Sequence, residues 1–196
     1  IDNISGYAWS SNIGWISLNS ADEGGATNYG VTAAAGGALS GYAWSSNIGW
    51  VSFNSGELAG CPASADNPTC APKINRTSGE FSGWARACAG TVAGDCAGAS
   101  RDDGWDGWIS LKGASPLYGV RAASGNPCGL AGWAWGGAVV GWINFDTASG
   151  NGNACALAIP TTPLIVSCAA NPNPAMLRET VIWSAAVSGG TSPYSY

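Results

Sequence analysis

Residues 4–20 read ISGYAWSSNIGWISLNS, and residues 39–55 read LSGYAWSSNIGWVSFNS. The two stretches differ at three positions only, which carry Ile, Ile and Leu in the first copy and Leu, Val and Phe in the second. The second copy follows the first at an offset of 35 residues (39 − 4). Near-identity at a fixed spacing indicates a chain built from repeated structural units.

Two divergent copies follow. The third begins as FSGWAR (81–86) and resumes as DGWISL (106–111), and the fourth reads LAGWAWGGAVVGWINF (130–145). Between the two conserved halves lie about three residues in copies one and two, about four in copy four and roughly twenty in copy three (Ala87–Gly104). Insertions confined to one place mark an exposed end of a fold. We therefore expect four copies of one hairpin, each with its tip at the surface.

A further conserved element lies upstream of copies two, three and four. It reads Tyr29-Gly30-Val31, Lys73-Ile74-Asn75 and Tyr118-Gly119-Val120. Tyr, Trp, Val and Ile favour β-strands, and the Gly and Ser-Asn positions between them favour turns. The sequence thus predicts an all-β fold of four three-stranded repeats over residues 1–159. The repeats are expected to form a small propeller-like ring or a linear stack.

The faces of the hairpin follow from the turn at its tip. In copy two, a turn at residues 45–47 would place Trp44 opposite Ile48 and Tyr42 opposite Trp50. We therefore expect the aromatic residues to share one face and to form the core between stacked units. The alternative is that these rings contact a ligand such as a glycan. The expected repeat core comprises Tyr7, Trp9, Trp15, Tyr42, Trp44, Trp50, Trp84, Trp108, Trp133, Trp135 and Trp142.

The insertion of copy three and its flank hold side chains that stand outside the repeat pattern. Trp105 is the one tryptophan that we expect at the surface as a contact residue. Asp102, Asp103 and Asp106 lie within SRDDGWDGW, a short acidic spacing that could hold Ca²⁺ through carboxylate and carbonyl oxygens. The spacing is not that of an EF-hand, and a full set of ligands is not evident. A solvated turn is therefore the preferred interpretation of these acids, and Ca²⁺ binding is the alternative.

The composition argues against catalysis, nucleic-acid binding and membrane insertion. Charged residues make up 10% of the chain and the formal net charge is −5, whereas phosphate binding needs clustered Lys and Arg. The chain contains no His, so a conventional Ser–His–Asp triad is impossible. It has no apolar run of about 18 residues that could span a membrane. We expect no enzymatic activity and no cofactor apart from the weak Ca²⁺ candidate.

Seven Cys in a chain this poor in charge indicate cystines and an oxidising compartment. Six of them flank or lie within loops around copies three and four, where closing a loop stabilises a segment that lacks a core of its own. Six Cys allow 15 sets of three disulfides, and the sequence alone does not exclude the other sets. We select two pairs that each close a short loop and a third pair that brackets copy four, which leaves Cys168 over. The predicted disulfides are Cys61–Cys70, Cys88–Cys96 and Cys128–Cys155.

The sequence changes character after the fourth copy. We predict a Pro-rich linker at residues 160–164. Residues 165–196 look like the first two strands of an immunoglobulin-like sandwich, with Cys168 on the first strand and Trp183 on the second. Such a sandwich needs about seven strands and ~100 residues. We therefore expect it to continue beyond Tyr196 and to supply the partner of Cys168 there.

The repeat and the tail together resemble a family. GYAWSSNIGWVSF, the upstream YGV and GWARAC…DGWDGWISL are similar to tandem repeats in large predicted surface proteins of uncultivated, small-genome bacteria. In those proteins similar repeats precede PKD-like or Ig-like domains that begin in the manner of VSCAANPNP. The resemblance covers roughly residues 1–190 and implies an extracellular protein, but no particular activity.

The first copy lacks the upstream strand that precedes the others, so its hairpin would present an unpaired edge. The spacing from Trp15 to Tyr29, applied to Trp142, reaches residues 155–159, which we expect to supply the missing strand. They would pair with residues 4–9 of the same chain and close a ring. Alternatively, they would pair with the next subunit and build a filament by strand addition. Closure within the chain is the preferred interpretation.

Two functions are consistent with these features. The first is a non-enzymatic structural or adhesive repeat module of a cell-surface or filament protein, whose partners are other subunits or domains of the same assembly. The second is a carbohydrate-binding module that uses exposed Trp and Tyr. Exposed, coplanar tryptophan rings would favour the second function, and rings buried between units the first. In both cases we expect an extracellular or cell-surface location, no nucleic-acid partner and no membrane span in this segment.

Overall fold

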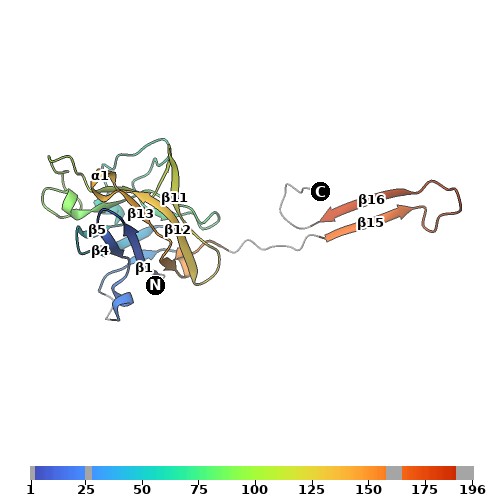
Figure 1. Ribbon diagram of the computed structural model, residues 1–196, viewed down its shortest axis with the longest axis horizontal. Coiled ribbons are helices and arrows are strands. Elements are labelled where there is room, and N and C mark those ends of the chain that lie inside the picture. Colours follow the sequence, from blue (N-terminus) through green and yellow to red (C-terminus); the bar gives the residue numbers. More distant parts are fainter. Residues whose placement is uncertain (1–2, 25–27, 158–164, 189–196) are drawn as a thin grey trace. The chain divides into compact units, whose positions relative to one another are not determined.

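The computed structural model describes residues 3–24, 28–157 and 165–188, and the chain divides into two compact units, Ile1–Ala158 and Ile159–Tyr196 (Figure 1). Antiparallel strands dominate both units, which confirms the prediction of a mainly β fold. Among the described residues, no helix is long and apolar enough to cross a membrane.

Eight strands of the first unit form a closed antiparallel barrel. They pair in the order β1–β2–β4–β5–β8–β9–β12–β13, and β13 returns to β1 through Trp9↔Asn144 and Ser10↔Ile143. The ring consists of four hairpins side by side, so every barrel strand is paired on both sides. The strands are β1 (Asn3–Ser10), β2 (Gly14–Ser17), β4 (Leu39–Ser45), β5 (Gly49–Ser52), β8 (Trp84–Ala87), β9 (Trp108–Ser110), β12 (Cys128–Trp135) and β13 (Trp142–Asn144).

Outer strands lie at the end of the barrel remote from the hairpin tips. β3 (Val31–Ala33) pairs with the first half of β4, β6 (Lys73–Ile74) pairs with β7 (Phe81–Ser82), and β11 (Leu117–Ala122) pairs with β12. β11 also forms a hairpin with β10 (Lys112–Ala114). The helical elements are all short: η1 (Ser20–Glu23), η2 (Ser55–Glu57), η3 (Cys88–Gly90), α1 (Gly137–Val140) and η4 (Gly152–Ala154).

The first copy receives its outer strand from the far end of the barrel sequence, but from a segment other than the predicted one. β14 (Ala148–Gly150) pairs with the first half of β1. Of the predicted segment 155–159, Cys155 is bonded to Cys128, and residues 158 and 159 lie outside the described residues. The prediction was wrong because it assumed connections of constant length, whereas a tight turn follows Phe145. Closure occurs within the chain, as a barrel instead of a propeller-like ring or a linear stack.

The barrel interior is filled by layers in which small and large side chains face each other. In each hairpin an Ala with no exposed surface pairs across the strands with Ile or Val, a combination that fits the narrow interior of an eight-stranded barrel. Larger apolar side chains form a second layer toward the outer strands. The first layer comprises Ala8, Ile16, Ala43, Val51, Ala85, Ile109, Ala134 and Ile143, and the second Ile4, Leu18, Leu39, Phe53, Phe81, Leu111, Leu130 and Phe145.

The large aromatic side chains occupy the outer face of the barrel, so the prediction that they form the repeat core was wrong. Successive residues of a strand point to opposite faces, and burial of Ala43 therefore turns Trp44 outward. Trp44 pairs with Trp50, and Ile48 lies buried in the hairpin tip, which shifts the register from the expected one. Of the predicted core, Trp108 is buried, Tyr7, Tyr42 and Trp84 are half-buried, and Trp9, Trp15, Trp44, Trp50, Trp133, Trp135 and Trp142 are exposed.

A glycine at one position of each hairpin allows the outer strand to approach. Gly41 has a φ of +96°, and a Cβ atom there would lie 2.0 Å from the carbonyl oxygen of Gly30. Its N–H donates to Oδ1 of Asn54 at 2.8 Å, and its carbonyl oxygen accepts from the N–H of Phe53 at 2.9 Å. The same combination of positive φ, close carbonyl and Asn or Asp acceptor occurs at Gly6, Gly83 and Gly132. The bend between barrel and outer strand therefore requires glycine in all four copies.

Three disulfides are present, and they join the pairs selected from loop closure: Cys61–Cys70, Cys88–Cys96 and Cys128–Cys155. The first closes the loop before copy three, and the second closes the insertion of that copy. The third ties the start of β12 to the segment that follows β14, next to the place where the barrel closes. Two of the three thus fix loops, and one reinforces the closure of the ring.

The second unit is described over one hairpin, in which β15 (Ile165–Asn171) pairs with β16 (Ile182–Ser188) along seven residues. Cys168 lies on β15 and is an exposed free cysteine. Trp183 on β16 is 73% exposed. The predicted linker 160–164 lies outside the described residues. The assignment of this hairpin to an Ig-like sandwich, with a partner for Cys168 on a later strand, stays a prediction.

Candidate ligand-binding surface

Three pairs of tryptophan rings stand on the outer face of the barrel, on the hairpins of copies one, two and four. The two residues of each pair are cross-strand neighbours, and their ring centroids lie 4.7 Å apart in all three pairs. The rings are tilted against each other and are not coplanar. Their exposed fractions range from 36% for Trp135 to 53% for Trp15. We call Trp9–Trp15, Trp44–Trp50 and Trp135–Trp142 the tryptophan pairs.

Tyrosine rings hold these pairs in place. Each tyrosine lies edge-on to the tryptophan on the second strand of a hairpin, with centroids 5.0 Å to 6.0 Å apart. Edge-to-face contacts favour one arrangement of the rings, so the surface is positioned before any ligand arrives. The contacts are Tyr7–Trp15, Tyr29–Trp50, Tyr42–Trp50 and Tyr118–Trp142.

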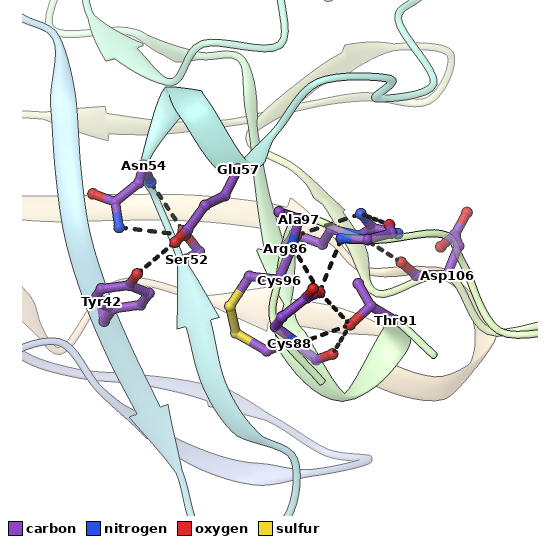
Figure 2. The surroundings of a disulfide bond; sticks show 12 residues. Tyr42, Ser52, Asn54, Glu57, Arg86, Cys88, Thr91, Cys96, Ala97 and Asp106 are labelled. Carbon is purple, nitrogen blue, oxygen red and sulfur yellow. Dashed lines mark hydrogen bonds between the residues drawn. A yellow bond between two sulfur atoms is a disulfide. The ribbon is translucent and has the colours of Figure 1, made fainter. Parts of the chain in front are cut away.

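Tyr42 is fixed further by the carboxylate of Glu57. The hydroxyl of Tyr42 donates to Oε1 of Glu57 at 2.6 Å, and Oε2 accepts from the hydroxyl of Ser52 and from Nδ2 of Asn54 (Figure 2). The hydrogen bond to Glu57, together with burial and the charge of that carboxylate, raises the pKa of Tyr42 above its ordinary value. Hydrogen bonds to a charged partner are strong, so they restrain the ring beside Trp50.

The equivalent position of copy three carries a different pair. Arg86 occupies the place of Trp44, and its guanidinium lies over the ring of Trp108, with Cζ 4.4 Å from the ring centroid. Both side chains are buried, with exposed fractions of 2% for Arg86 and 7% for Trp108. A cation over an indole face is a favourable contact, and it strengthens when water is excluded. The position that is open in the other three copies is therefore closed in copy three.

The insertion of copy three provides the cover, and its polar groups hold Arg86 (Figure 2). The guanidinium donates to the carbonyl oxygens of Gly98 at 2.9 Å and Asp106 at 3.0 Å, and to the hydroxyl of Ser100 at 3.0 Å. Burial lowers the pKa of Arg86 from its ordinary value. The Cys88–Cys96 disulfide closes the loop that directly precedes Gly98, and the carbonyl oxygen of Cys96 also accepts from the guanidinium at 3.4 Å. Arg86 thus anchors the insertion to the outer face of the barrel.

Hollows lie beside the tryptophan pairs. Their volumes, from about 300 Å³ to about 370 Å³, fall within the range that accommodates small ligands. One of about 370 Å³ separates the rings of copy two from the disulfide-bonded loop of the insertion. Another of about 310 Å³ adjoins the pair of copy four. The hollow of copy two is lined by Tyr29, Tyr42, Trp50 and Cys96 among others. The hollow of copy four is lined by Pro116, Leu117, Tyr118, Trp133 and Trp142.

The remaining predicted site residues have other roles. Trp105 is partly buried against the core, with its Nε1 buried and without a hydrogen-bond partner, and its role as a surface contact stays a prediction. Asp103 forms an ion pair with Arg101, and Oδ1 of Asp106 accepts from the N–H of Trp108 at 3.1 Å. Within the part of the chain that the structure describes, no group of three or more acidic, Cys or His side chains could hold a metal ion. The Ca²⁺ candidate Asp102, Asp103 and Asp106 is therefore not assembled.

Sequence reasoning overlooked Arg86 and Glu57. The signal for Arg86 was available, because copy three reads GWAR where copies one and two read GYAW and copy four reads GWAW. A cation at a position that is otherwise tryptophan, followed directly by an insertion, indicates a contact between the two. No comparable signal marks Glu57, since it lies in a loop whose path depends on the closed barrel.

Comparison of the chain with protein-family models, with curated proteins and with solved structures finds no match. The outer face of the barrel combines exposed, oriented indole rings with tyrosine side chains and hollows of ligand size. In proteins in general, pockets of small-molecule sites are lined mainly by apolar and aromatic side chains together with a few polar groups.

Proposed function

We propose that the chain is a non-enzymatic adhesive module of an extracellular, cell-surface protein, and that its barrel binds carbohydrate through exposed Trp and Tyr side chains. The tryptophan pairs carry this proposal, because they are oriented by tyrosines and open to solvent. The barrel core is complete without them, since aliphatic side chains and Phe fill the interior. Exposed aromatic groups that the core does not need are typical of a binding surface.

A sugar suits this surface for chemical reasons. One face of a pyranose ring consists of C–H groups that can stack on an indole, and its hydroxyls can reach polar groups at the rim. The chain has a net charge of −5 and only seven basic residues, which disfavours a polyanion such as nucleic acid. Carbohydrate is therefore the ligand class that the exposed groups and the charge favour together.

The proposed extracellular location rests on the disulfides, and the proposed partners rest on the arrangement of the domains. Three disulfides suit an oxidising, extracellular compartment. We further propose that the barrel is a four-copy repeat module followed by the start of an Ig-like domain at residues 165–196. Other domains or subunits of the same surface assembly are its remaining partners. Since every barrel strand is already paired on both sides, such partners would contact side chains and not add strands to the barrel.

A glycan array probed with the purified chain tests this function, followed by calorimetric titration of a bound glycan. Replacing one ring of each pair together (Trp15→Ala, Trp50→Ala and Trp142→Ala) should weaken binding at least ~10-fold, because a lost stacking contact costs about 1 kcal/mol or more. The melting temperature of the barrel should change little, since these rings lie outside the core.

Trp183→Ala provides the control, because Trp183 is also an exposed tryptophan but lies in the second unit. This variant should bind glycan like the unmodified chain. An array on which no glycan is bound would contradict the proposed function. So would a triple variant that binds with unchanged affinity.

A further inference from the structure

One hollow on the outer face of copy four has an aromatic wall bordered by side chains of both charges, two cations and two carboxylates. It has a volume of about 490 Å³, and the β10–β11 hairpin and β12 supply most of its lining. It shares Leu117, Tyr118 and Trp133 with the adjoining hollow of about 310 Å³. The residues that matter for its chemistry are Asp66, Glu80, Lys112, Tyr118, Arg121 and Trp133.

The aromatic wall is held rigidly. Tyr118 pairs across the β10–β11 hairpin with Gly113, and a Cβ atom at Gly113 would lie 2.4 Å from Cε1 of the tyrosine ring. The ring of Tyr118 therefore rests over a residue that has no side chain. On its other side it lies edge-on to Trp142, at 5.0 Å between centroids and 80° between planes. Trp133, 44% exposed, completes the wall with a ring open to solvent.

The rim carries two cations and two carboxylates. Nζ of Lys112 lies 3.3 Å from Oε2 of Glu80, and both side chains are partly shielded from solvent. The backbone of Glu80 pairs with that of Arg121, which brings Arg121 to the same edge. The ion pairs formed by the described residues are Lys112–Glu80 and Arg101–Asp103. The charges of Asp66 and Arg121 are therefore available to a ligand.

The balance of charge decides which ligand the hollow suits. A polyanionic ligand would meet the two carboxylates of Asp66 and Glu80 as well as the net negative charge of the chain. A neutral molecule rich in hydroxyls meets no such repulsion. Each hydroxyl both donates and accepts, so neighbouring hydroxyls can donate to the carboxylate of Asp66 and accept from the guanidinium of Arg121.

We propose that this hollow binds a neutral pyranose with neighbouring free hydroxyls, stacked on Trp133 and hydrogen-bonded to Arg121 and Asp66. The inference rests on the proposed function and narrows it to one site and one class of glycan. Tyr118 acts as a positioning residue that supports the aromatic wall.

Calorimetric titration of the full chain tests the site with a panel of neutral hexose oligosaccharides and, separately, with uronic-acid and sialylated oligosaccharides. Trp133→Ala and Arg121→Ala should each weaken binding of the neutral glycan at least ~10-fold, as expected for the loss of a stacking or a charge-assisted contact. Trp183→Ala and Lys73→Ala, which remove an exposed ring and an exposed cation elsewhere, should leave the affinity unchanged. The affinity should also vary by less than about twofold with salt, because the ligand is uncharged.

The outcomes separate the site from the function. If neutral glycans bind but Trp133→Ala and Arg121→Ala bind equally well, carbohydrate binding stands and this site is wrong. If only uronic-acid or sialylated glycans bind, with a strong salt dependence, the inferred ligand class is wrong. If neither panel binds to the unmodified chain, the proposed function fails together with the site. Circular dichroism melting of each variant shows whether a loss of binding arises from unfolding.

Discussion

Two constraints require glycine at position 41: a positive φ and a backbone oxygen close to the place of a Cβ atom. Gly24 is subject to the first constraint only, and Gly56 to neither. At Gly41 the backbone has a φ of +96°, and an added Cβ would lie 2.0 Å from a backbone oxygen. Gly24 has a φ of +79°, but nothing lies within 4 Å of its Cβ position. Gly56 has neither a positive φ nor a close neighbour. The three positions therefore separate backbone strain from steric overlap.

We expect Gly41→Ala to destabilise the barrel by at least ~3 kcal/mol, because strain and overlap both act there. Gly24→Ala should cost about 1 kcal/mol from strain alone, and Gly56→Ala should be neutral or slightly stabilising. Urea unfolding followed by tryptophan fluorescence gives the three values. Equal effects at Gly41 and Gly24 would show that the outer strand does not need the close approach seen at Gly30.

At the scale of elements, the sequence is informative about strands and less so about their faces. The spacing of GYAW and GWVSF locates β4 and β5, because β-formers alternate with Gly and Ser. It does not fix the register, because Ile48 can belong either to the strand or to the tip. A shift by two residues decides which side chains face each other. The inward face could be predicted only by knowing that the sheet closes, since closure excludes indoles from the interior.

The disulfides and the candidate site also show that local sequence patterns predict local contacts but not contacts between distant segments. Loop closure sufficed to select Cys88–Cys96, because the pair lies within one short insertion. The hollow of copy four joins Asp66 to Arg121 and Trp133, which are far apart in the sequence. No local pattern links these residues, and they meet only because the strands of the four copies are arranged around a closed ring. The sequence allowed an exposed aromatic surface as the alternative to an aromatic core. It did not predict that Asp66, Glu80, Lys112 and Arg121 would border that surface.

Arg86 holds the insertion of copy three against the barrel, so its replacement should affect both the stability of the barrel and the order of the insertion. Arg86→Leu should destabilise the barrel by about 3 kcal/mol, because the partly buried carbonyl oxygens of Gly98 and Asp106 lose a charged donor and the cation over Trp108 is lost. The insertion should also become sensitive to proteolysis, since nothing else holds it over Trp108 in the same way. Arg101→Ala is the matched control, because its ion pair with Asp103 is exposed. It should leave the unfolding midpoint unchanged.

If Arg86→Leu unfolds at the same urea concentration as the original chain, Arg86 does not anchor the insertion. Limited proteolysis then gives an independent reading. Cleavage confined to the insertion in Arg86→Leu, and absent in Arg101→Ala, would show that the cover has been released while the barrel stays folded.

At the scale of the whole molecule, the ends of the barrel sequence are the most interdependent part. β1 pairs with β2, β3, β13 and β14, and the last two place it beside residues more than 130 positions away. The hydroxyl of Thr147 donates to the carbonyl oxygen of Tyr7 at 2.6 Å, and Oδ1 of Asp146 accepts from the N–H of Gly132 at 2.9 Å. A repeat stack would tolerate the loss of its last segment, because each repeat contacts only its neighbours. A closed barrel would not.

This difference leads to a test by truncation. A chain of residues 1–158 keeps every barrel strand and should unfold at the same temperature as the barrel of the full chain, because the first compact unit ends there. A chain of residues 1–145 retains all four hairpins but lacks β14 and Cys155. Its loss of the disulfide alone should cost about 3–4 kcal/mol, and β1 loses its outer strand in addition. Cys128→Ala with Cys155→Ala in the 1–158 chain isolates the first effect. If 1–145 is no less stable than that double variant, β14 contributes nothing to closure and the four hairpins alone define the ring.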